Sequence, residues 1–153
     1  MAVTAPTLDN LILDLSYEIT VRASLEATFA SILEQMGPAN AGANDAPMPM
    51  VLEPWPGGRW FRDLGQGNGH FWGHVQAIKR PTLLEIVGPL FMSHPVISNV
   101  QYRLTETADG TLMTFRHSAL GFVPDEIRVG VKDGWEPLFE RVRRQAEGGR
   151  RIH

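Results

Sequence analysis

The segment from Glu53 to Phe61 reads Glu-Pro-Trp-Pro-Gly-Gly-Arg-Trp-Phe, and it constrains the fold more than any other part of the chain. Proline presets φ and glycine accepts positive φ, so Pro56-Gly57-Gly58 predicts a sharp reversal of the chain. A strand-like alternating pattern follows from Arg59. Two large rings, Trp55 and Trp60, flank the reversal. Together these features predict a turn beside a tightly packed or hollow wall.

Short segments with strand-like character recur along the chain, most of them after this turn. The predicted strands are Leu11–Val21, Met50–Glu53, Arg59–Leu64, His70–Ile78, Leu83–Val87, Ile97–Thr105 and Thr111–Ser118. Asn68-Gly69 favours a primed hairpin turn, and Asp109-Gly110 is a second hairpin signal. This spacing predicts successive antiparallel neighbours rather than strand–helix–strand units.

Two helices are predicted, one near each end of the chain. Ser24 is a suitable N-cap for a helix that ends at Met36, where Gly37-Pro38 stops it. A continuous apolar stripe predicts a long C-terminal helix; its members are Ile127, Val131, Trp135, Leu138 and Val142. Gly134 and Pro137 predict a kink or a restart near Asp133. Glu140 and Arg144 are predicted to pair at i,i+4.

The length and the order of these elements indicate an α+β protein of one domain, residues 1–153. The core is predicted to span about residues 11–146, and residues 147–153 are predicted to form a disordered tail. Gly37–Met50 has no periodicity and is predicted to be a long loop. A single long helix lying across a strongly curved sheet often leaves an internal space.

Composition and charge limit the compartment and the partners. The net charge of −3 offers no electrostatic reason to expect nucleic acid or an anionic membrane. No apolar run approaches the ~20 residues of a membrane-spanning helix, and the first six residues lack a signal-peptide pattern. A cytoplasmic protein is therefore predicted. The absence of cysteine excludes disulfides, a thiol nucleophile and thiolate metal sites.

Five local texts, taken in order, are similar to those of one known superfamily. They are Thr20-Val21-Arg22-Ala23-Ser24, Glu53 to Trp60, Gly73-His74-Val75 with Lys79-Arg80-Pro81, Thr114 to Ser118, and Gly134-Trp135. Their order and spacing resemble the START-like superfamily (SRPBCC), in the branch of homologues of the activator of heat-shock protein 90 ATPase. The resemblance covers roughly Ile12 to Arg144. It implies the helix-grip fold: a curved antiparallel sheet of about six or seven strands wrapped around a long C-terminal helix, with a cavity between them.

The family pattern also implies which residues face inward. In the family, the segment that corresponds to Gly37–Met50 borders the mouth of the cavity and commonly carries short helical turns. The predicted ligand-binding residues are Trp60, Arg62, Ile86, Tyr102, Met113, Phe115, His117 and Trp135. Their apolar members are either plain core or cavity lining. Arg62, Tyr102 and His117 either make internal hydrogen bonds or lie at the rim, or else they orient the polar end of a ligand.

Other chemistries find little support in the residues. His70 and His74 would lie ~13 Å apart on a strand, too far to share one metal ion. His117 and Ser118 would point to opposite faces of a strand, and no Gly-x-Ser-x-Gly elbow is present. The glycines at 65, 67 and 69 do not match a dinucleotide-binding pattern. Neither a metal nor a cofactor is therefore expected.

Three functions remain open. The preferred one is a binding module for a small hydrophobic or aromatic ligand. The second is an enzyme of the cyclase, dehydratase or hydrolase kind, with His117 as acid or base and Tyr102 or Arg62 stabilising charge. The third, which rests on the resemblance alone, is a regulator of a chaperone ATPase. An unpaired sheet edge would also allow a homodimer.

Overall fold

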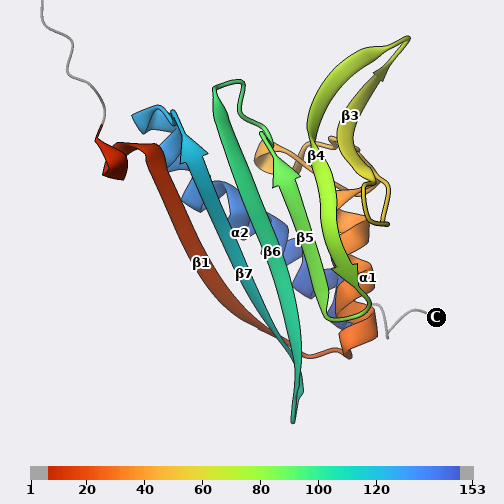
Figure 1. The fold of residues 1–153 in the computed structure, drawn as a ribbon. Helices are drawn as coiled ribbons and strands as arrows, with labels where there is room; N and C mark the ends of the chain where they lie inside the picture. Colours follow the sequence, from red (N-terminus) through yellow and green to blue (C-terminus); the bar gives the residue numbers. More distant parts are fainter. Residues whose placement is uncertain (1–6, 149–153) are drawn as a thin grey trace, which may run out of the picture.

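A computed structural model describes residues 7–148 of the chain, and Figure 1 shows its fold. Seven strands form one curved antiparallel sheet in the order β1-β7-β6-β5-β4-β3-β2. The strands are β1 (Ile12–Val21), β2 (Val51–Leu52), β3 (Arg59–Gly65), β4 (Asn68–Lys79), β5 (Leu83–Gly88), β6 (Val96–Thr107) and β7 (Gly110–Gly121). The helices α1 (Leu25–Met36) and α2 (Asp125–Gly148) lie on the same face of this sheet (Figure 1). The α+β class and the helix-grip architecture are confirmed.

The most regular part of the sheet joins β1, β7 and β6. The β1–β7 register runs unbroken from Ile12 opposite Leu120 to Val21 opposite Thr111. A 3₁₀ turn, η1 (Leu8–Leu11), leads into β1. Alternate residues of β7 are buried, as its period of two predicts. The inner face of the sheet therefore carries every second side chain of these strands.

The Trp55–Gly58 turn has the geometry that its prolines and glycines predicted. The Gly58 N–H donates to the Trp55 carbonyl at 2.8 Å, and Gly57 between them has φ +83°, as a type II turn requires. A Cβ on Gly58 would lie 1.9 Å from the Glu53 carbonyl oxygen, so only glycine fits there. Trp60, just after the turn, is 1% exposed, whereas Trp55 lies at the surface.

The β3–β4 hairpin turns two residues earlier than its sequence predicted. Gly65 pairs with Asn68, so the two-residue loop is Gln66-Gly67 and not Asn68-Gly69. Both loop residues have positive φ, 56° for Gln66 and 80° for Gly67, as a type I′ turn requires. Asn68 instead begins β4, and its side-chain amide donates to the Gly65 carbonyl. Since Gly67 already occupies the second left-handed position of the turn, Asn68 can pair with Gly65 in the β3–β4 ladder.

Helix α1 begins after Ser24, whose hydroxyl accepts the Ala27 N–H at 3.0 Å, as the predicted N-cap requires. Its inner face buries Phe29 and Met36, among others. At the end of the helix, the indole N–H of Trp60 donates to the Met36 carbonyl at 2.8 Å. The last carbonyls of a helix have no partner within it, so this bond satisfies one of them. Trp60 thereby joins β3 to α1.

A kink or a restart was predicted near Asp133; helix α2 is one helix from Asp125 to Gly148, so the restart is wrong. Pro137 lies inside the helix and removes one N–H, the donor that the Asp133 carbonyl would normally receive. Asp133 is exposed, so water can satisfy that carbonyl without a break in the helix.

None of the helices within residues 7–148 combines the length and apolarity needed to cross a membrane.

The last turn of α2 extends beyond the predicted core boundary at residue 146. Arg143 contacts Glu140 and, at 3.4 Å, Glu147, so Glu140 pairs with Arg143 and not with Arg144 as predicted. Because Arg143 lies between two carboxylates, it is the better placed partner. Glu147 also accepts the backbone N–H of Arg22 at 2.9 Å. Residues 149–153 of the predicted tail lie outside the described residues.

The predicted loop Gly37–Met50 contains one short 3₁₀ turn, η2 (Ala43–Asp45), enclosed by an isolated β-bridge. The side-chain amide of Asn40 donates to the Met48 carbonyl at 3.0 Å. The segment therefore has hydrogen bonds of its own, and its helical turn brings it closer to the family pattern than its sequence indicated.

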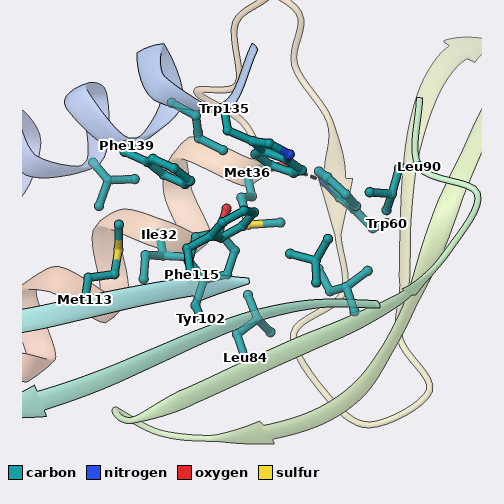
Figure 2. Close-up of a cluster of buried hydrophobic side chains, with 14 of the residues drawn as sticks. Ile32, Met36, Trp60, Leu84, Leu90, Tyr102, Met113, Phe115, Trp135 and Phe139 are labelled. Carbon is teal, nitrogen blue, oxygen red and sulfur yellow. Dashed lines mark hydrogen bonds between the residues drawn. The ribbon is translucent and has the colours of Figure 1, made fainter. Parts of the chain in front are cut away.

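The core fills the space between the sheet and the two helices (Figure 2). Phe115 of β7 lies at its centre, with ring centroids 4.9 Å from Tyr102, 4.6 Å from Phe139 and 4.7 Å from Trp135. Packed rings thus occupy the space under the middle of α2.

Candidate functional site

A cleft of about 340 Å³ opens at one end of the core, between α2, the Gly37–Met50 loop and strands β3 and β4. This volume is within the range of small-molecule pockets. Four aromatic rings line it: Trp60, Trp72, Phe91 and Trp135. We refer to it as the aromatic cleft. A wider groove of about 790 Å³ lies between α1 and α2, but small and polar side chains line it and no ring does.

The first wall of the aromatic cleft is built by Trp60 and Trp72. The Trp60 indole is held by its bond to the Met36 carbonyl, and the Trp72 ring meets it edge-on at a centroid distance of 4.9 Å. The Trp72 N–H donates to Nδ1 of His70 at 3.0 Å. Both indoles therefore have their polar atom satisfied, and they present their apolar surface to the cleft.

A β-bulge in β4 turns Trp72 into the cleft. Trp60 pairs with Gly73 and Phe61 pairs with Phe71, so Trp72 is an extra residue on β4. Glycines allow the close approach of β4 and β5 at this point, because a Cβ on Gly88 would lie 2.5 Å from the Gly73 Cα. Without the bulge, strict alternation would direct Trp72 and Gly73 to opposite faces.

Phe91 reaches the cleft from the loop between β5 and β6. Leu90, the residue before it, has φ +59°, a conformation that costs a non-glycine residue about 1–2 kcal/mol. Its N–H donates to the Trp72 carbonyl at 2.8 Å and its side chain is fully buried, which holds this conformation. Phe91 is left 37% exposed at the rim, and its ring lies 6.1 Å from that of Trp72.

The wall formed by α2 contains Trp135, whose indole N–H donates to Nδ1 of His117 at 3.1 Å. Since Nδ1 accepts this hydrogen bond, a neutral His117 carries its own hydrogen on Nε2, which lies 2.9 Å from the Ser98 hydroxyl. Burial lowers the pKa of His117 to about 4. His117 is therefore a neutral side chain with both ring nitrogens bonded, and it holds Trp135 in place.

Arg141 and Asn40 supply the polar part of the cleft lining. The Arg141 guanidinium donates to the Gln35 side-chain oxygen, the Ala41 carbonyl and the Asp45 carboxylate, at 3.2, 3.3 and 3.2 Å. These contacts join α2 to α1 and to the Gly37–Met50 loop. The positive charge of Arg141 thus lies where the Gly37–Met50 loop contacts α2.

The predicted ligand-binding residues divide into two groups in the structure. Trp60 and Trp135 line the aromatic cleft. The others, apart from Arg62, are packed core: Ile86, Tyr102, Met113, Phe115 and His117. The Tyr102 hydroxyl has no hydrogen-bond partner among residues 7–148, and burial raises its pKa.

Arg62 lies apart from these groups. It is half-buried on β3 opposite His70, and it is not among the residues that line the aromatic cleft. Within the described part of the chain, no hydrogen bond or ion pair joins it to Tyr102 or His117. The three polar residues considered together from the sequence do not form one cluster.

Several cleft residues were not predicted from the sequence. Trp72 had no local signal, because only the bulge places it on the inner side. Phe91 lies in a loop, and Arg141 lies on a helix face that looks solvated in the sequence. Among residues 7–148, no three histidine, aspartate or glutamate side chains gather as metal ligands would.

Sequence comparison finds one matching family profile, described as Activator of Hsp90 ATPase homolog 1-like protein, over residues 46–146. The matched segment includes every strand except β1, most of α2 and all four rings of the aromatic cleft. A comparison with curated proteins finds no match.

Solved structures with the same fold include the di-domain ARO/CYC StfQ from the steffimycin biosynthetic pathway. Its TM-score is 0.68 at 12% identity, over 95% of this chain and 54% of that one, so this chain spans about half of its length. A protein of unknown function from Staphylococcus aureus has a TM-score of 0.68 at 13% identity, over 95% and 100% of the two chains. A Mesorhizobium loti protein has 0.62 at 22% identity, over 86% and 95%. At these identities the likeness shows the fold alone.

Proposed function

The chain belongs to the family of Activator of Hsp90 ATPase homolog 1-like proteins, and on that premise we propose that it is a binding module for a small apolar or aromatic molecule. The fold supports a ligand-binding domain in general. The observation that carries the proposal is the aromatic cleft, where four rings surround about 340 Å³ of space that is open to solvent. When an apolar ligand enters such a concave site, apolar surface of both the ligand and the site is removed from water, and this favours binding.

Catalysis by His117 has less support than binding. Its two ring nitrogens are bonded to Trp135 and Ser98, and it does not line the cleft. A general acid or base must reach the substrate directly or through one water. Trp135 lies between His117 and the cleft, so the histidine acts on the cleft only by holding the Trp135 ring in place.

The proposal is tested with N-phenyl-1-naphthylamine, a neutral aromatic probe whose fluorescence rises in an apolar site. We expect saturable binding to the wild-type protein. Phe91→Ala removes one ring of the cleft from a half-exposed loop position, and we expect about ten-fold weaker binding.

Phe122→Ala is the matched control, because Phe122 is 50% exposed and lies outside the cleft. It should bind the probe as the wild type does. If wild-type protein fails to bind the probe, or if both variants bind it equally well, the proposal is wrong.

The family description names an activator of the Hsp90 ATPase, so action on a chaperone is a second candidate. Adding the purified protein to an Hsp90 chaperone and measuring ATP hydrolysis tests it. Stimulation in proportion to the added protein would support this candidate, and an unchanged rate would remove it.

A further inference from the structure

Two glycines in the interior of α2 form part of the wall of the aromatic cleft. Gly130 and Gly134 are four residues apart, so they lie on the same side of the helix, together with Val131 and Trp135. Apart from the chain neighbours and the adjacent helix backbone, no heavy atom of residues 7–148 lies within 4 Å of the position that a Cβ would take on either glycine. Glycine disfavours a helix interior, and here it is not required by packing. The pair leaves the helix backbone bare where it faces the cleft.

The opposite side of the cleft consists of rings. Trp72 and Phe91 lie 6.1 Å apart at 66°, and Trp60 lies edge-on to Trp72. The α2 side of the cleft thus offers bare backbone beside the Trp135 ring, and the other side offers rings that meet one another at steep angles; we refer to this space as the slot. A planar ring system can approach bare backbone closely and make face or edge contacts with such rings, whereas a bulky branched group would be held away from the backbone.

One end of the slot carries a positive charge. Among the described residues that line the cleft, Arg141 is charged and none is acidic. The Arg141 side chain is 13% exposed, and its ion-pair partner, Asp45, has a side chain that is 67% exposed. The three contacts of Arg141 use three of its five N–H donors. A weakly compensated guanidinium with free donors is suited to a carboxylate, a sulfonate or a similar anion.

The spacing along α2 sets the size of the ligand. Gly134 and Arg141 are seven residues apart, which is about 10 Å along a helix. We propose that the aromatic cleft binds an elongated planar aromatic anion, with its rings against Gly130 and Gly134 and its acidic group at Arg141. This inference rests on the proposed function and specifies the class of ligand.

The slot is tested with 2-(p-toluidinyl)naphthalene-6-sulfonate, an elongated aromatic probe with a terminal sulfonate. Gly134→Leu fills the slot with a side chain, and we expect at least about ten-fold weaker binding. Because leucine favours a helix more than glycine does, the Tm should stay the same or rise, so the loss cannot come from unfolding.

Val129→Leu is the control for Gly134→Leu, since Val129 is 73% exposed on α2 and lies outside the cleft. It should bind the probe with wild-type affinity. If Gly134→Leu binds the probe with wild-type affinity, the proposal that the ligand's rings lie against Gly130 and Gly134 is wrong.

The charged end is tested by comparing this probe with its uncharged counterpart, N-(p-tolyl)-2-naphthylamine. Arg141→Gln should weaken binding of the sulfonate about ten-fold and leave the neutral compound unchanged. Asp45→Asn should strengthen binding of the sulfonate a few-fold, because it removes the competing carboxylate from an exposed position.

Equal effects of these variants on both compounds would overturn the anionic end of the inference. If N-phenyl-1-naphthylamine binds but neither Gly134→Leu nor Arg141→Gln alters sulfonate binding, this inference fails while the proposed function stands. If none of the three compounds binds to the wild type, both fail.

Discussion

His117 shows how a single polar residue can be kept inside an aromatic core. A buried indole N–H needs an acceptor, and Nδ1 of His117 supplies one to Trp135. The remaining ring nitrogen meets Ser98 on the neighbouring strand β6. The charged form of His117 would lose the acceptor and would be poorly solvated, so the folded protein keeps it neutral.

Stability should therefore fall as the pH is lowered from about 6.5 towards 4. An unfolded histidine takes up a proton near pH 6.5, whereas folded His117 does so only near its pKa of about 4. The unfolded state binds more protons in this window, so the free energy of unfolding decreases, by roughly 3 kcal/mol at pH 4. Urea denaturation at closely spaced pH values measures this loss.

The variant His117→Asn, which keeps an acceptor for Trp135, should have a lower stability and a flatter pH dependence between 6.5 and 4.5. Arg116 lowers the pKa of Asp14, and Arg59 lowers the pKa of Glu53 to about 2. The stability that these carboxylates contribute is lost only below the pKa of an unfolded carboxyl, near 4. An equal slope in wild type and variant above pH 4.5 would contradict the assignment to His117.

Among the elements, α2 combines poor local propensity with a continuous helix. Gly130, Gly134 and Pro137 all disfavour a helix interior. The buried stripe that includes Trp135 and Leu138 packs against the core and outweighs them. Local preference alone therefore predicted a kink or a restart, and packing prevents the restart.

Pro137→Ala should stabilise the protein, because it restores the N–H that the Asp133 carbonyl lacks and removes the clash of the ring with the preceding turn. The expected gain in the free energy of unfolding is up to about 3 kcal/mol. Urea denaturation measures it, with Glu136→Ala at the adjacent exposed position as a control that should change little. A loss of stability in Pro137→Ala would mean that the proline ring contributes packing that the helix needs.

Across the whole molecule, the two halves of the sheet differ in the regularity of their strand pairing and in whether they border the aromatic cleft. The ladder of β1, β7 and β6 is unbroken, whereas the β3–β4 register shifts twice. The aromatic cleft lies at the irregular half, beside the Gly37–Met50 loop. The outer edge of β1 pairs with no strand among the described residues, and the homodimer through such an edge stays a prediction.

Hydrogen exchange should separate these two halves. Amides in the centres of β6 and β7, which are paired on both sides, should exchange only through global unfolding. Amides of β2, β3 and the Gly37–Met50 loop should exchange at least about ten-fold faster, through local opening. Exchange measured by mass spectrometry on proteolytic fragments tests this, and uniform protection across the sheet would contradict it.

Much of this protein follows from local sequence. The strands, the Ser24 cap and the turn after Glu53 were predictable because alternation, a hydroxyl before a helix and a proline–glycine pair act over a few residues. Burial of Trp60 and Phe115 followed from the same alternation once the sheet had an inner face, and burial of Trp135 followed from the apolar stripe of the C-terminal helix.

The binding site itself depended on the tertiary structure. The bulge that turns Trp72 inward, the left-handed Leu90 before Phe91, and the contacts of Arg141 with α1 and the loop each involve chain segments far apart in sequence. Local patterns determine which side chains are buried, because periodicity alone assigns a side chain to the inner or the outer face of its strand or helix. Whether two buried faces meet as packed rings or leave a cleft depends on how distant elements pack, and here glycines at 130 and 134 leave room that no local pattern records.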